Sequence, residues 1–481
     1  MQPAQSREAI VGVDVGTTTI CGVAVSSSGE LVASVERPND AAVADLPTGW
    51  AEQDPGRIRE RVFEVLRELT GGLGGVTCVG LTGQMHGMLC VDAAGEPVAR
   101  LITWQDSRCL EPTPTSETYL DQIRDLVPAG VWEACGCRPA SGFMGCTLFW
   151  MCRNDALPPA AQRVSFIHDW IGGTLTGQLP VTDPSDAGSS GLFDLARMCW
   201  HQAIVQALGL PARLLPPVRP SGEVIGGVSA DAAAGTGLKT GTPVCNAVGD
   251  NQASVLGSLA NVERSILINL GTGGQISWVV PSFCRVQGME TRYLPQGRYL
   301  LVGASLCGGR AFAWLNDVVR DWLRAFGCQP DRERVYERLC ELAASAPVGT
   351  RELMARTTLA GTRTDPSLRG SFDRISLDNF SLANVARAVL EALVEELCVL
   401  YGGAGHGTRP RHDTVVASGN AVRKNPLLRE IIAARLARPV LVPRHREEAA
   451  FGAALLAGVG AGLWPDLDTA GRFVQYASPQ K

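Results

Sequence analysis

One short pattern occurs twice in this 481-residue chain and limits the folds that it can adopt. Within residues 10–25, an apolar run reaches Asp14, a Gly-Thr turn follows, and a second apolar run begins. Residues 265–280 repeat this arrangement, with Asn269 in the place of Asp14 and the same Gly-Thr pair in the turn. Continuous apolar runs of this length are typical of strands that are buried on both faces of a sheet. The repeat therefore predicts two buried β-hairpins in two related halves that face one ligand.

The chain is too long for one ordinary hydrophobic core, so we expect two domains, residues 1–255 and residues 256–481. Its net charge of −5 argues against nucleic acid as the main partner. The first residues lack the apolar core of a secretory leader, and the longest uncharged segment, 449–464, is shorter than the roughly 20 residues that cross a bilayer. The 15 cysteines have no zinc-like spacing and are scattered in apolar runs, which is typical of reduced thiols. We therefore expect a cytoplasmic monomer or homodimer without a membrane partner.

The remaining hydrophobic pattern predicts an α/β protein. Residues 165–176 are expected to form a helix that Gly177 closes, and residues 110–145 an irregular loop region. Segment 449–464 is rich in alanine and glycine, so we expect a tightly packed internal helix there. We expect further strands at 76–82, 243–248 and 414–417, and further helices at 56–69, 252–259, 311–326, 331–345 and 381–401.

Each Gly-Thr turn offers backbone N–H groups and hydroxyls to an anion. Glycine lets the backbone approach such a ligand without a Cβ clash. One such turn alone is more often only a tight turn, but the duplication in matching strands favours a phosphate site. The candidate phosphate-binding residues are Gly16, Thr17, Thr18, Gly271, Thr272 and Gly273.

Two aspartates, Asp14 just before the first turn and Asp250 elsewhere in the chain, are candidates for the chemistry. Asp14 cannot itself bind phosphate, but it can hold a Mg²⁺ that bridges phosphate oxygens. Asp250 follows the strand expected at 243–248 and stands where a helix begins, and a helix N-terminus stabilises a carboxylate. An aspartate carboxylate is an adequate base for phosphoryl transfer, because catalysis of that reaction depends mainly on positioning the reacting groups. The alternative for Asp250 is a purely structural N-cap. The chain has no Gly-Lys dipeptide, which excludes a Walker-type loop.

Two polar turns, at 82–87 and 103–108, follow other strand-like runs. Their side chains include an amide, an imidazole, a carboxylate and a guanidinium, which can form hydrogen bonds with hydroxyl groups. They also include an indole, whose face can pack on C–H groups. This set suits a sugar, although a single histidine is more often structural. The candidate sugar-binding residues are Gln84, Met85, His86, Trp104, Asp106 and Arg108.

The phosphate motifs and the segment 249–254 resemble those of the FGGY carbohydrate kinases. That family belongs with actin, hexokinase and Hsp70, so the resemblance implies two ribonuclease H-like domains around an ATP cleft. It implies ATP and Mg²⁺ as cofactors, with Asp14 on the metal side and Asp250 as the catalytic aspartate at the substrate. The first domain would carry the sugar and the first phosphate hairpin, and the second the nucleotide. Residues 448–454 resemble the helix that joins the domains, and the adenosine contacts would fall on Ser418, Gly419, Asn420 and Asn425.

Within this family, residues 84–87 and 104–106 resemble the xylulokinase-like members. Residues 103–109, 141–150 and 167–170 resemble members that phosphorylate sedoheptulose. The resemblance therefore implies phosphorylation of a ketose at its terminal hydroxyl, with sedoheptulose as the leading substrate and D-xylulose as the second.

Two other functions remain open on the same fold. One is a nucleotide-switching scaffold of the actin or Hsp70 type, which would not need the two polar turns. The other is a catalytically silent sugar sensor, against which the presence of Asp14 and Asp250 argues.

Overall fold

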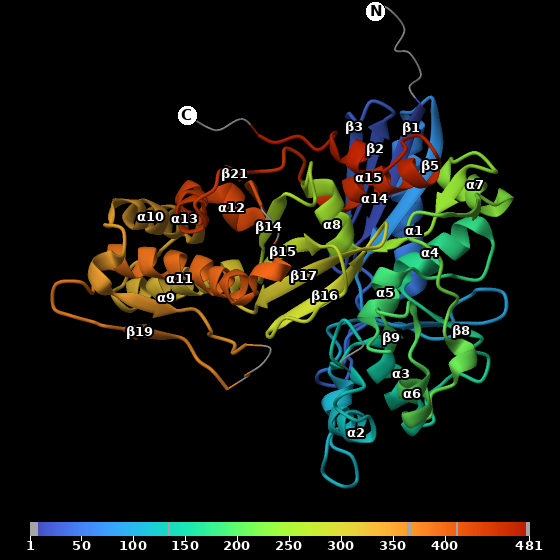
Figure 1. Cartoon of the computed structure of the whole chain (residues 1–481), viewed down its shortest axis with the longest axis horizontal. Coiled ribbons are helices and arrows are strands. Elements are labelled where there is room, and N and C mark those ends of the chain that lie inside the picture. The colour runs from blue at the N-terminus through green and yellow to red at the C-terminus, as the bar shows by residue number, and fades with distance from the viewer. Residues whose placement is uncertain (1–7, 133–134, 363–364, 366, 410–411, 478–481) are drawn as a thin grey trace, which may run out of the picture.

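The computed structural model describes residues 8–132, 135–362, 365, 367–409 and 412–477. The chain forms two lobes that lie side by side, with most of each half of the chain in its own lobe (Figure 1). The last two helices, α14 (Glu448–Gly460) and α15 (Leu467–Gly471), return to the first lobe and lie beside its strands (Figure 1). The predicted α/β fold is confirmed.

The first lobe is built on a mixed sheet in the order β11-β12-β5-β1-β2-β3, with β13 beside the end of β5. The hairpin β1–β2 is antiparallel, and both β1 and β12 run parallel to β5. The hairpin strands are almost wholly buried, which explains their continuous apolar runs. The strands are β1 (Glu8–Val15), β2 (Thr19–Ser26), β3 (Leu31–Pro38), β5 (Gly75–Gly83), β11 (Val224–Gly227), β12 (Pro243–Cys245) and β13 (Val248–Gly249).

The second lobe repeats this topology in the order β16-β17-β15-β14-β20-β21. The hairpin β14–β15 corresponds to β1–β2, and β14 runs parallel to β20 as β1 does to β5. Strands β17 and β21 take the places of β3 and β12, in the same directions. Five strands of each sheet therefore match in order and direction. The strands are β14 (Ser265–Leu270), β15 (Gly274–Val280), β16 (Met289–Leu294), β17 (Arg298–Ser305), β20 (Thr414–Ser418) and β21 (Val440–Leu441).

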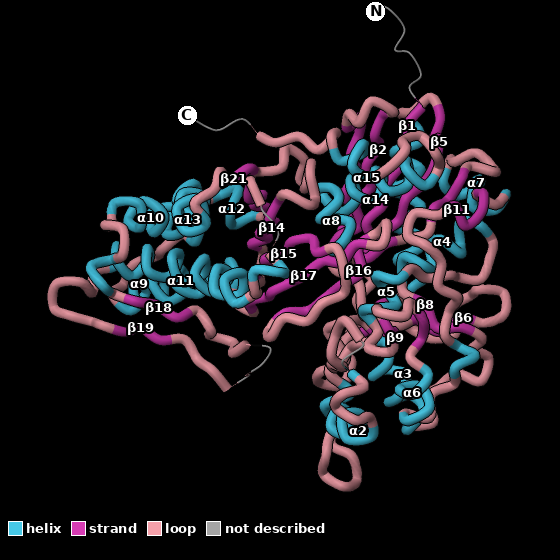
Figure 2. The backbone as a smooth tube through the Cα atoms, viewed as in Figure 1, coloured by secondary structure: helices cyan, strands magenta, loops and turns pink. Residues whose placement is uncertain are grey.

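Helices cover both sheets and complete two cores (Figure 2). In the first lobe these are α1 (Pro55–Gly71), α4 (Ile167–Thr176), α5 (Pro184–Ser189), α7 (Ala230–Thr236) and α8 (Asp250–Ser258). A smaller part below them contains α2 (Tyr119–Leu126), α3 (Met144–Arg153), α6 (Gln202–Ala207) and the short strands β4 (Glu52–Gln53), β6 (Leu89–Val91), β7 (Leu101–Ile102), β8 (Arg163–Ser165), β9 (Phe193–Asp194) and β10 (Cys199–Trp200). The second lobe has α9 (Gly308–Ala325), α10 (Arg332–Ser345), α11 (Leu382–Gly403), α12 (Asn420–Lys424), α13 (Pro426–Leu436), β18 (Met354–Arg356) and β19 (Ser371–Asp373).

Most predicted elements are confirmed within a few residues, and two differ for local reasons. The region expected to be irregular contains α2, because Thr118 and Asp121 cap its N-terminus reciprocally. The strand expected at 243–248 is divided into β12 and β13 at Asn246. The Asn246 N–H donates to the Glu223 oxygen at 2.7 Å, and the Asn246 oxygen accepts from the Gly222 N–H at 2.9 Å, so its backbone does not pair with β5.

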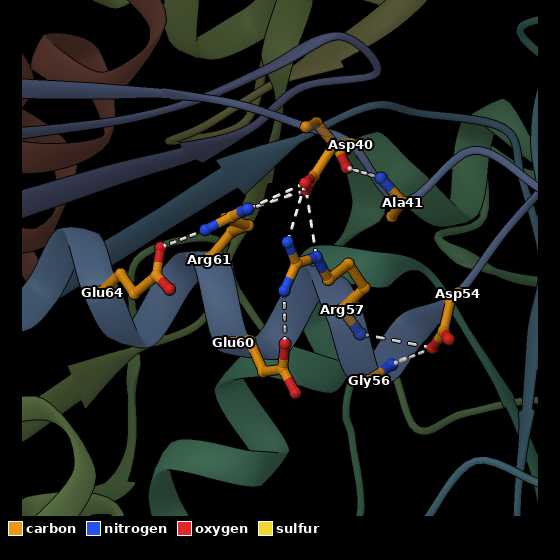
Figure 3. A network of polar contacts seen from close by, with 9 residues as sticks. Asp40, Ala41, Asp54, Gly56, Arg57, Glu60, Arg61 and Glu64 are labelled. Carbon is orange, nitrogen blue, oxygen red and sulfur yellow. Dashed lines mark hydrogen bonds and ion pairs between the residues drawn. The ribbon is translucent and has the colours of Figure 1, made fainter.

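The first turns of α1 are joined to the segment after β3 by an exposed network of charges (Figure 3). Asp54 caps the helix, and Asp40 accepts from Arg57 and Arg61, each at 2.8 Å. These two guanidinium groups hold the pKa of Asp40 well below its usual range. Because solvent screens the network, it directs the chain at the start of α1 more than it stabilises the fold.

Helices α8 and α14 join the lobes through direct backbone contact. A Cβ added to Gly257 of α8 would lie 1.9 Å from the Glu448 carbonyl oxygen, and one added to Gly452 of α14 would lie 1.9 Å from that of Ala253. The other face of α14 is pressed as closely onto β1, where a Cβ on Gly12 would lie 2.0 Å from the Ala450 oxygen. The uncharged segment at 449–464 thus contains the predicted internal helix. Across the described residues, no helix has both the length and the apolar character needed to cross a membrane.

Gly452→Ala tests this contact between the helices. The added Cβ forces α14 away from α8, so we expect the free energy of unfolding to fall by about 2 kcal/mol or more in urea denaturation. Gly402→Ala, at the exposed end of α11, is the matched control, because a Cβ there meets nothing within 4 Å and alanine favours a helix. Equal stability of Gly452→Ala and the native protein would contradict the packing described.

Candidate active site

Three adjacent strands of the first sheet end at one edge and bring candidate residues together. Asp14 on β1 lies opposite Thr82 on β5, and Val248 on β13 lies opposite Thr82 from the other side. The chain continues from these ends into Gln84 and Asp250. The carboxyl ends of parallel strands are where α/β proteins bind their ligands. The structure therefore gathers Asp14, Gln84 and Asp250, as the sequence analysis expected.

The carboxyl groups at this edge influence one another. Burial and the nearby charge of Asp250 raise the pKa of Asp14 to about 7, and Glu447 at the start of α14 acts in the same direction. Burial also raises the pKa of Asp250, while electrostatic interactions with Arg292 and His168 oppose that shift. Asp14 Oδ1 is buried and has no hydrogen-bond partner among the described residues. An unpaired carboxylate oxygen beside two further carboxyl groups is the kind of ligand set that a divalent cation prefers.

The first Gly-Thr turn is held in place by the side chains around it. Asn39 Nδ2 donates to the Gly16 oxygen at 2.8 Å, and Gln53 Nε2 donates to the Thr17 oxygen at 2.8 Å. The backbone oxygen of Thr18 accepts from the Asn39 N–H at 2.9 Å, and its side chain is exposed. These bonds fix the carbonyl groups of the turn to the protein and leave the Thr18 side chain facing solvent.

The same turn is linked directly to two candidate sugar residues. Trp104 Nε1 donates to Thr17 Oγ1 at 2.9 Å, and that hydroxyl donates to Gln84 Oε1 at 3.2 Å. Trp104 is 46% exposed, so most of the rest of the indole remains available to a ligand. The predicted phosphate turn and the predicted sugar turns therefore form one connected site.

The second Gly-Thr turn lies against the N-terminus of the long helix α9. The N–H of Gly309 donates to the Gly271 oxygen at 2.8 Å, and that of Arg310 donates to the Thr272 oxygen at 3.2 Å. Gly273 and the other two turn residues are exposed. A helix N-terminus carries partial positive charge and attracts phosphate. The predicted helix at 311–326 is confirmed as α9, but the contact of its N-terminus with this turn was not predicted.

The predicted adenosine loop follows β20, which pairs with β14 so that Ser418 lies opposite Asn269. Gly419 has a φ of 91°, and a Cβ on it would lie 2.5 Å from the Leu270 oxygen. Only glycine therefore fits at this crossing of two strands. Asn420 begins α12 and is exposed. The loop thus lies at the same edge as the second Gly-Thr turn.

Asn425 is set apart from the rest of that loop. It is 1% exposed, and its Oδ1 accepts from the Leu428 N–H at 3.4 Å at the start of α13. Its oxygen is used as a helix cap, so the structure places Asn425 under the loop and not on its surface.

Met85 lies beside the start of α8, and Met85 and His86 line one small cavity. A Cβ on Gly249 would lie 2.6 Å from Met85 Cε, so this thioether packs against the residue before Asp250. The His86 ring stacks on Phe143 at 4.1 Å with an angle of 5° between the planes. Its Nδ1 is 2.9 Å from the Ser189 oxygen. These contacts place Met85 next to the predicted catalytic aspartate and fix the orientation of the His86 ring.

Asp106 and Arg108 have other surroundings. Both are buried, and Arg108 Nε donates to Asp106 Oδ1 at 2.8 Å. Arg108 also donates to Glu52 Oε1 at 2.7 Å and lies 3.9 Å from the centre of the Trp50 ring. The other Asp106 oxygen accepts from the Ala51 N–H at 2.8 Å. The buried Asp106–Arg108 pair therefore supports, from the interior of the protein, the turn that carries Trp104.

Three loop segments that the sequence analysis singled out separately meet here. Ser141 Oγ donates to the Asp106 oxygen at 3.0 Å, and the Met144 N–H donates to the His86 oxygen at 2.7 Å. Residues 84–87, 103–109 and 141–150 thus form one wall of the site.

A buried cluster lies behind this wall. His168 Nε2 is 2.7 Å from Asp186 Oδ2, and Asp169 completes a group whose ligand atoms lie within 4.8 Å of one another. The cluster is wholly enclosed, and burial raises the pKa of both Asp169 and Asp186. Together with Arg292 and Glu447, Asp186 was absent from the predicted site. Each comes from an element distant in sequence, and no local motif identifies it.

Comparison with known families extends these observations. The model of the N-terminal domain of the FGGY family of carbohydrate kinases matches residues 9–257, and that of the C-terminal domain matches residues 266–461. The sedoheptulokinase of Homo sapiens is 28% identical over 94% of this chain and 97% of its own. The glycerol kinase of Dechloromonas aromatica is 26% identical over 96% and 91%. The crystal structure of xylulose kinase from Rhodospirillum rubrum superposes with a TM-score of 0.86 at 26% identity, over 98% of this chain and 93% of that one.

Asp14→Asn should stabilise the ligand-free protein at alkaline pH. Because the folded pKa of Asp14 lies near 7, above its ordinary value, the folded state loses stability as pH rises from about 4 to about 7, and the loss is complete above that pH. The asparagine variant avoids this loss, so its free energy of unfolding at pH 8 should exceed that of the native protein by roughly 2 kcal/mol or more, with a smaller gain at pH 5. Urea denaturation in EDTA measures both. Asp231→Asn on exposed α7 is the control, and an equal effect of both variants at both pH values would refute the assignment.

Proposed function

The chain belongs to the FGGY family of carbohydrate kinases, and on this basis we propose that it transfers a phosphoryl group from ATP to the terminal hydroxyl of a ketose. Sedoheptulose, giving sedoheptulose 7-phosphate, is the leading substrate, and D-xylulose is the second. Sedoheptulokinases of Homo sapiens and Mus musculus are each 28% identical to the chain, and xylulose kinases of Staphylococcus epidermidis are 26% identical. We propose that the enzyme is cytoplasmic and acts as a monomer or homodimer.

One observation carries this proposal: Asp250 begins a helix directly beside Asp14 and the sugar turn. Met85 packs against Gly249, and the charges of Asp14 and Asp250 act on each other. A metal-binding carboxylate, a base and a polar turn are the groups that phosphoryl transfer to a hydroxyl needs in one place.

Asp250 would accept the proton of the sugar hydroxyl as that oxygen bonds to phosphorus. Burial raises its pKa and so makes it a stronger base, while Arg292 and His168 favour the ionised form that can accept a proton. Gln84, Met85, His86 and Trp104 would contact the sugar. We propose that Asp106 and Arg108 contribute to sugar binding by holding the turn that carries Trp104. Enclosure of the site between the lobes would exclude water, which competes as a nucleophile.

The residues present fit ATP and Mg²⁺. Asp14 has a buried oxygen without a partner, which suits a cation, and a bound Mg²⁺ neutralises charge on phosphate oxygens. The exposed second turn and the N-terminus of α9 suit phosphate. We therefore assign the phosphates to Gly16, Thr17, Thr18, Gly271, Thr272 and Gly273, and the adenosine to Ser418, Gly419 and Asn420, with Asn425 as support.

This division gives each lobe a role. Residues 1–255 would bind the sugar and carry the first phosphate turn, and residues 256–481 would bind the nucleotide. Helix α14 belongs to the second segment by sequence but packs on the first sheet. Changes in the angle between the lobes would therefore pass through α8 and α14.

Asp250→Asn should abolish phosphoryl transfer, by roughly a thousandfold or more in kcat, because the amide cannot accept the hydroxyl proton. ATP should still bind with nearly native affinity in calorimetric titration, since the phosphate turns are unchanged. Asp231→Asn on α7 serves as the control for charge removal. Near-native turnover in Asp250→Asn would refute the role of this residue.

A panel of acceptors tests the substrate. ADP release is measured with sedoheptulose, D-xylulose, D-ribulose and glycerol, and we expect the highest kcat/KM with sedoheptulose. Comparable values for several ketoses would indicate a broad ketose kinase instead. ADP release that is independent of any sugar would favour the nucleotide-switching scaffold.

A further inference from the structure

We propose that Glu290 and Arg292 on β16 complete the sugar pocket from the second lobe and restrict it to uncharged sugars. This inference rests on the proposed function, since it concerns the acceptor pocket of that same site. Glu290 and Arg292 lie outside all the motifs that the sequence predicted.

Arg292 is part of the wall around a small cavity at the proposed sugar site. Met85, His86 and Ser189 of the first lobe line this cavity, and Arg292 and Tyr293 of the second lobe close it. Its volume is about 10 Å³, room for roughly one water molecule. A ketose therefore enters only when the two walls separate, and it then meets Arg292 on the side opposite His86.

While the two walls are together, contacts with the first lobe hold strand β16 and give Arg292 a defined position. Gln252 Nε2 on α8 donates to the Tyr293 oxygen at 3.0 Å. The Tyr293 ring packs in a cluster with Ala187 and Phe193, and Figure 1 shows β16 beside α5. Because α8 begins at Asp250, this bond connects the strand with Arg292 to the helix with the proposed base.

The charge of Arg292 is already matched by Glu290. The two residues are separated by one position and so project from the same face of β16. Arg292 Nε and Nη2 donate to Glu290 Oε2 at 3.2 and 2.7 Å, and the side chains are only 10% and 20% exposed. A planar guanidinium binds a carboxylate through such a pair of donors. With that pair of donors occupied, Arg292 can offer its other N–H groups singly, which suits a hydroxyl or carbonyl oxygen.

The surroundings also disfavour an acidic sugar. Asp250 lies close enough to Arg292 for their charges to interact. A sugar carboxylate would meet the negative charge of Asp250 and would have to compete with Glu290 for the guanidinium. The pocket thus selects for a neutral ketose and against an aldonate.

Steady-state kinetics of three variants test the inference. Arg292→Gln should raise KM for the preferred ketose about tenfold or more, with KM for ATP and the thermal midpoint near native. Glu290→Gln should raise kcat/KM for D-gluconate about tenfold relative to that for the ketose, because it frees the guanidinium for a carboxylate. Arg298→Gln on β17, whose partner is Asp468, is the matched control and should leave all these values unchanged.

The outcomes separate this inference from the proposed function. If the native enzyme phosphorylates a ketose while Arg292→Gln keeps its native KM, or Glu290→Gln keeps the native preference against D-gluconate, the inference is wrong and the kinase assignment stands. If Arg292→Gln raises KM for ATP as much as for the sugar, the pair is structural and the inference is also wrong. If the native protein neither binds these sugars in calorimetric titration nor phosphorylates them, both proposals are wrong.

Discussion

The contact between α8 and α14 is the constraint on which the rest of the structure depends. Glycines at the crossing let the two backbones touch, and α14 is pressed equally closely onto β1. This places the helix that begins at Asp250 against α14, which passes back from the second segment onto the centre of the first sheet. The carboxyl edge of the first sheet and the turns of the second therefore face a shared space. The distance between the lobes is fixed at this contact, because the two helix backbones touch with no side chains between them.

Duplication of the sheet supplies two similar turns, and small differences give them different chemistry. Asp14 keeps a carboxylate with an unpaired oxygen beside Asp250, whereas Asn269 is neutral and its turn lies at the N-terminus of α9. The first turn is also bonded to Gln84 and Trp104. The same local fold thus presents a carboxylate beside polar side chains in one lobe and a neutral turn at a helix N-terminus in the other.

The hairpins, the long helices and the closeness of Asp14 to Asp250 could be predicted, because each leaves a local pattern of apolar residues, glycines or strand ends. The pairing of Asp106 with Arg108 could not, since residue types do not reveal whether two charges meet each other or a ligand. Arg292 and Glu447 were invisible for a different reason: they reach the site from an edge strand and a late helix, and only tertiary packing brings them there. The break at Asn246 was hidden because it depends on backbone bonds to Gly222 and Glu223, which only the folded structure brings beside it.

The return of the C-terminal segment to the first sheet has a consequence for biosynthesis. The face of β1, β2 and β5 that α14 covers is apolar, with Ile10, Val23 and Cys78 fully buried beneath it. A chain that leaves the ribosome from its N-terminus forms these strands early but acquires their cover only after residue 448 has been made. During that interval the sheet is exposed on one side and open to aggregation or to a chaperone. The first sheet is therefore synthesised early but is completed only when α14, which is synthesised late, packs on it.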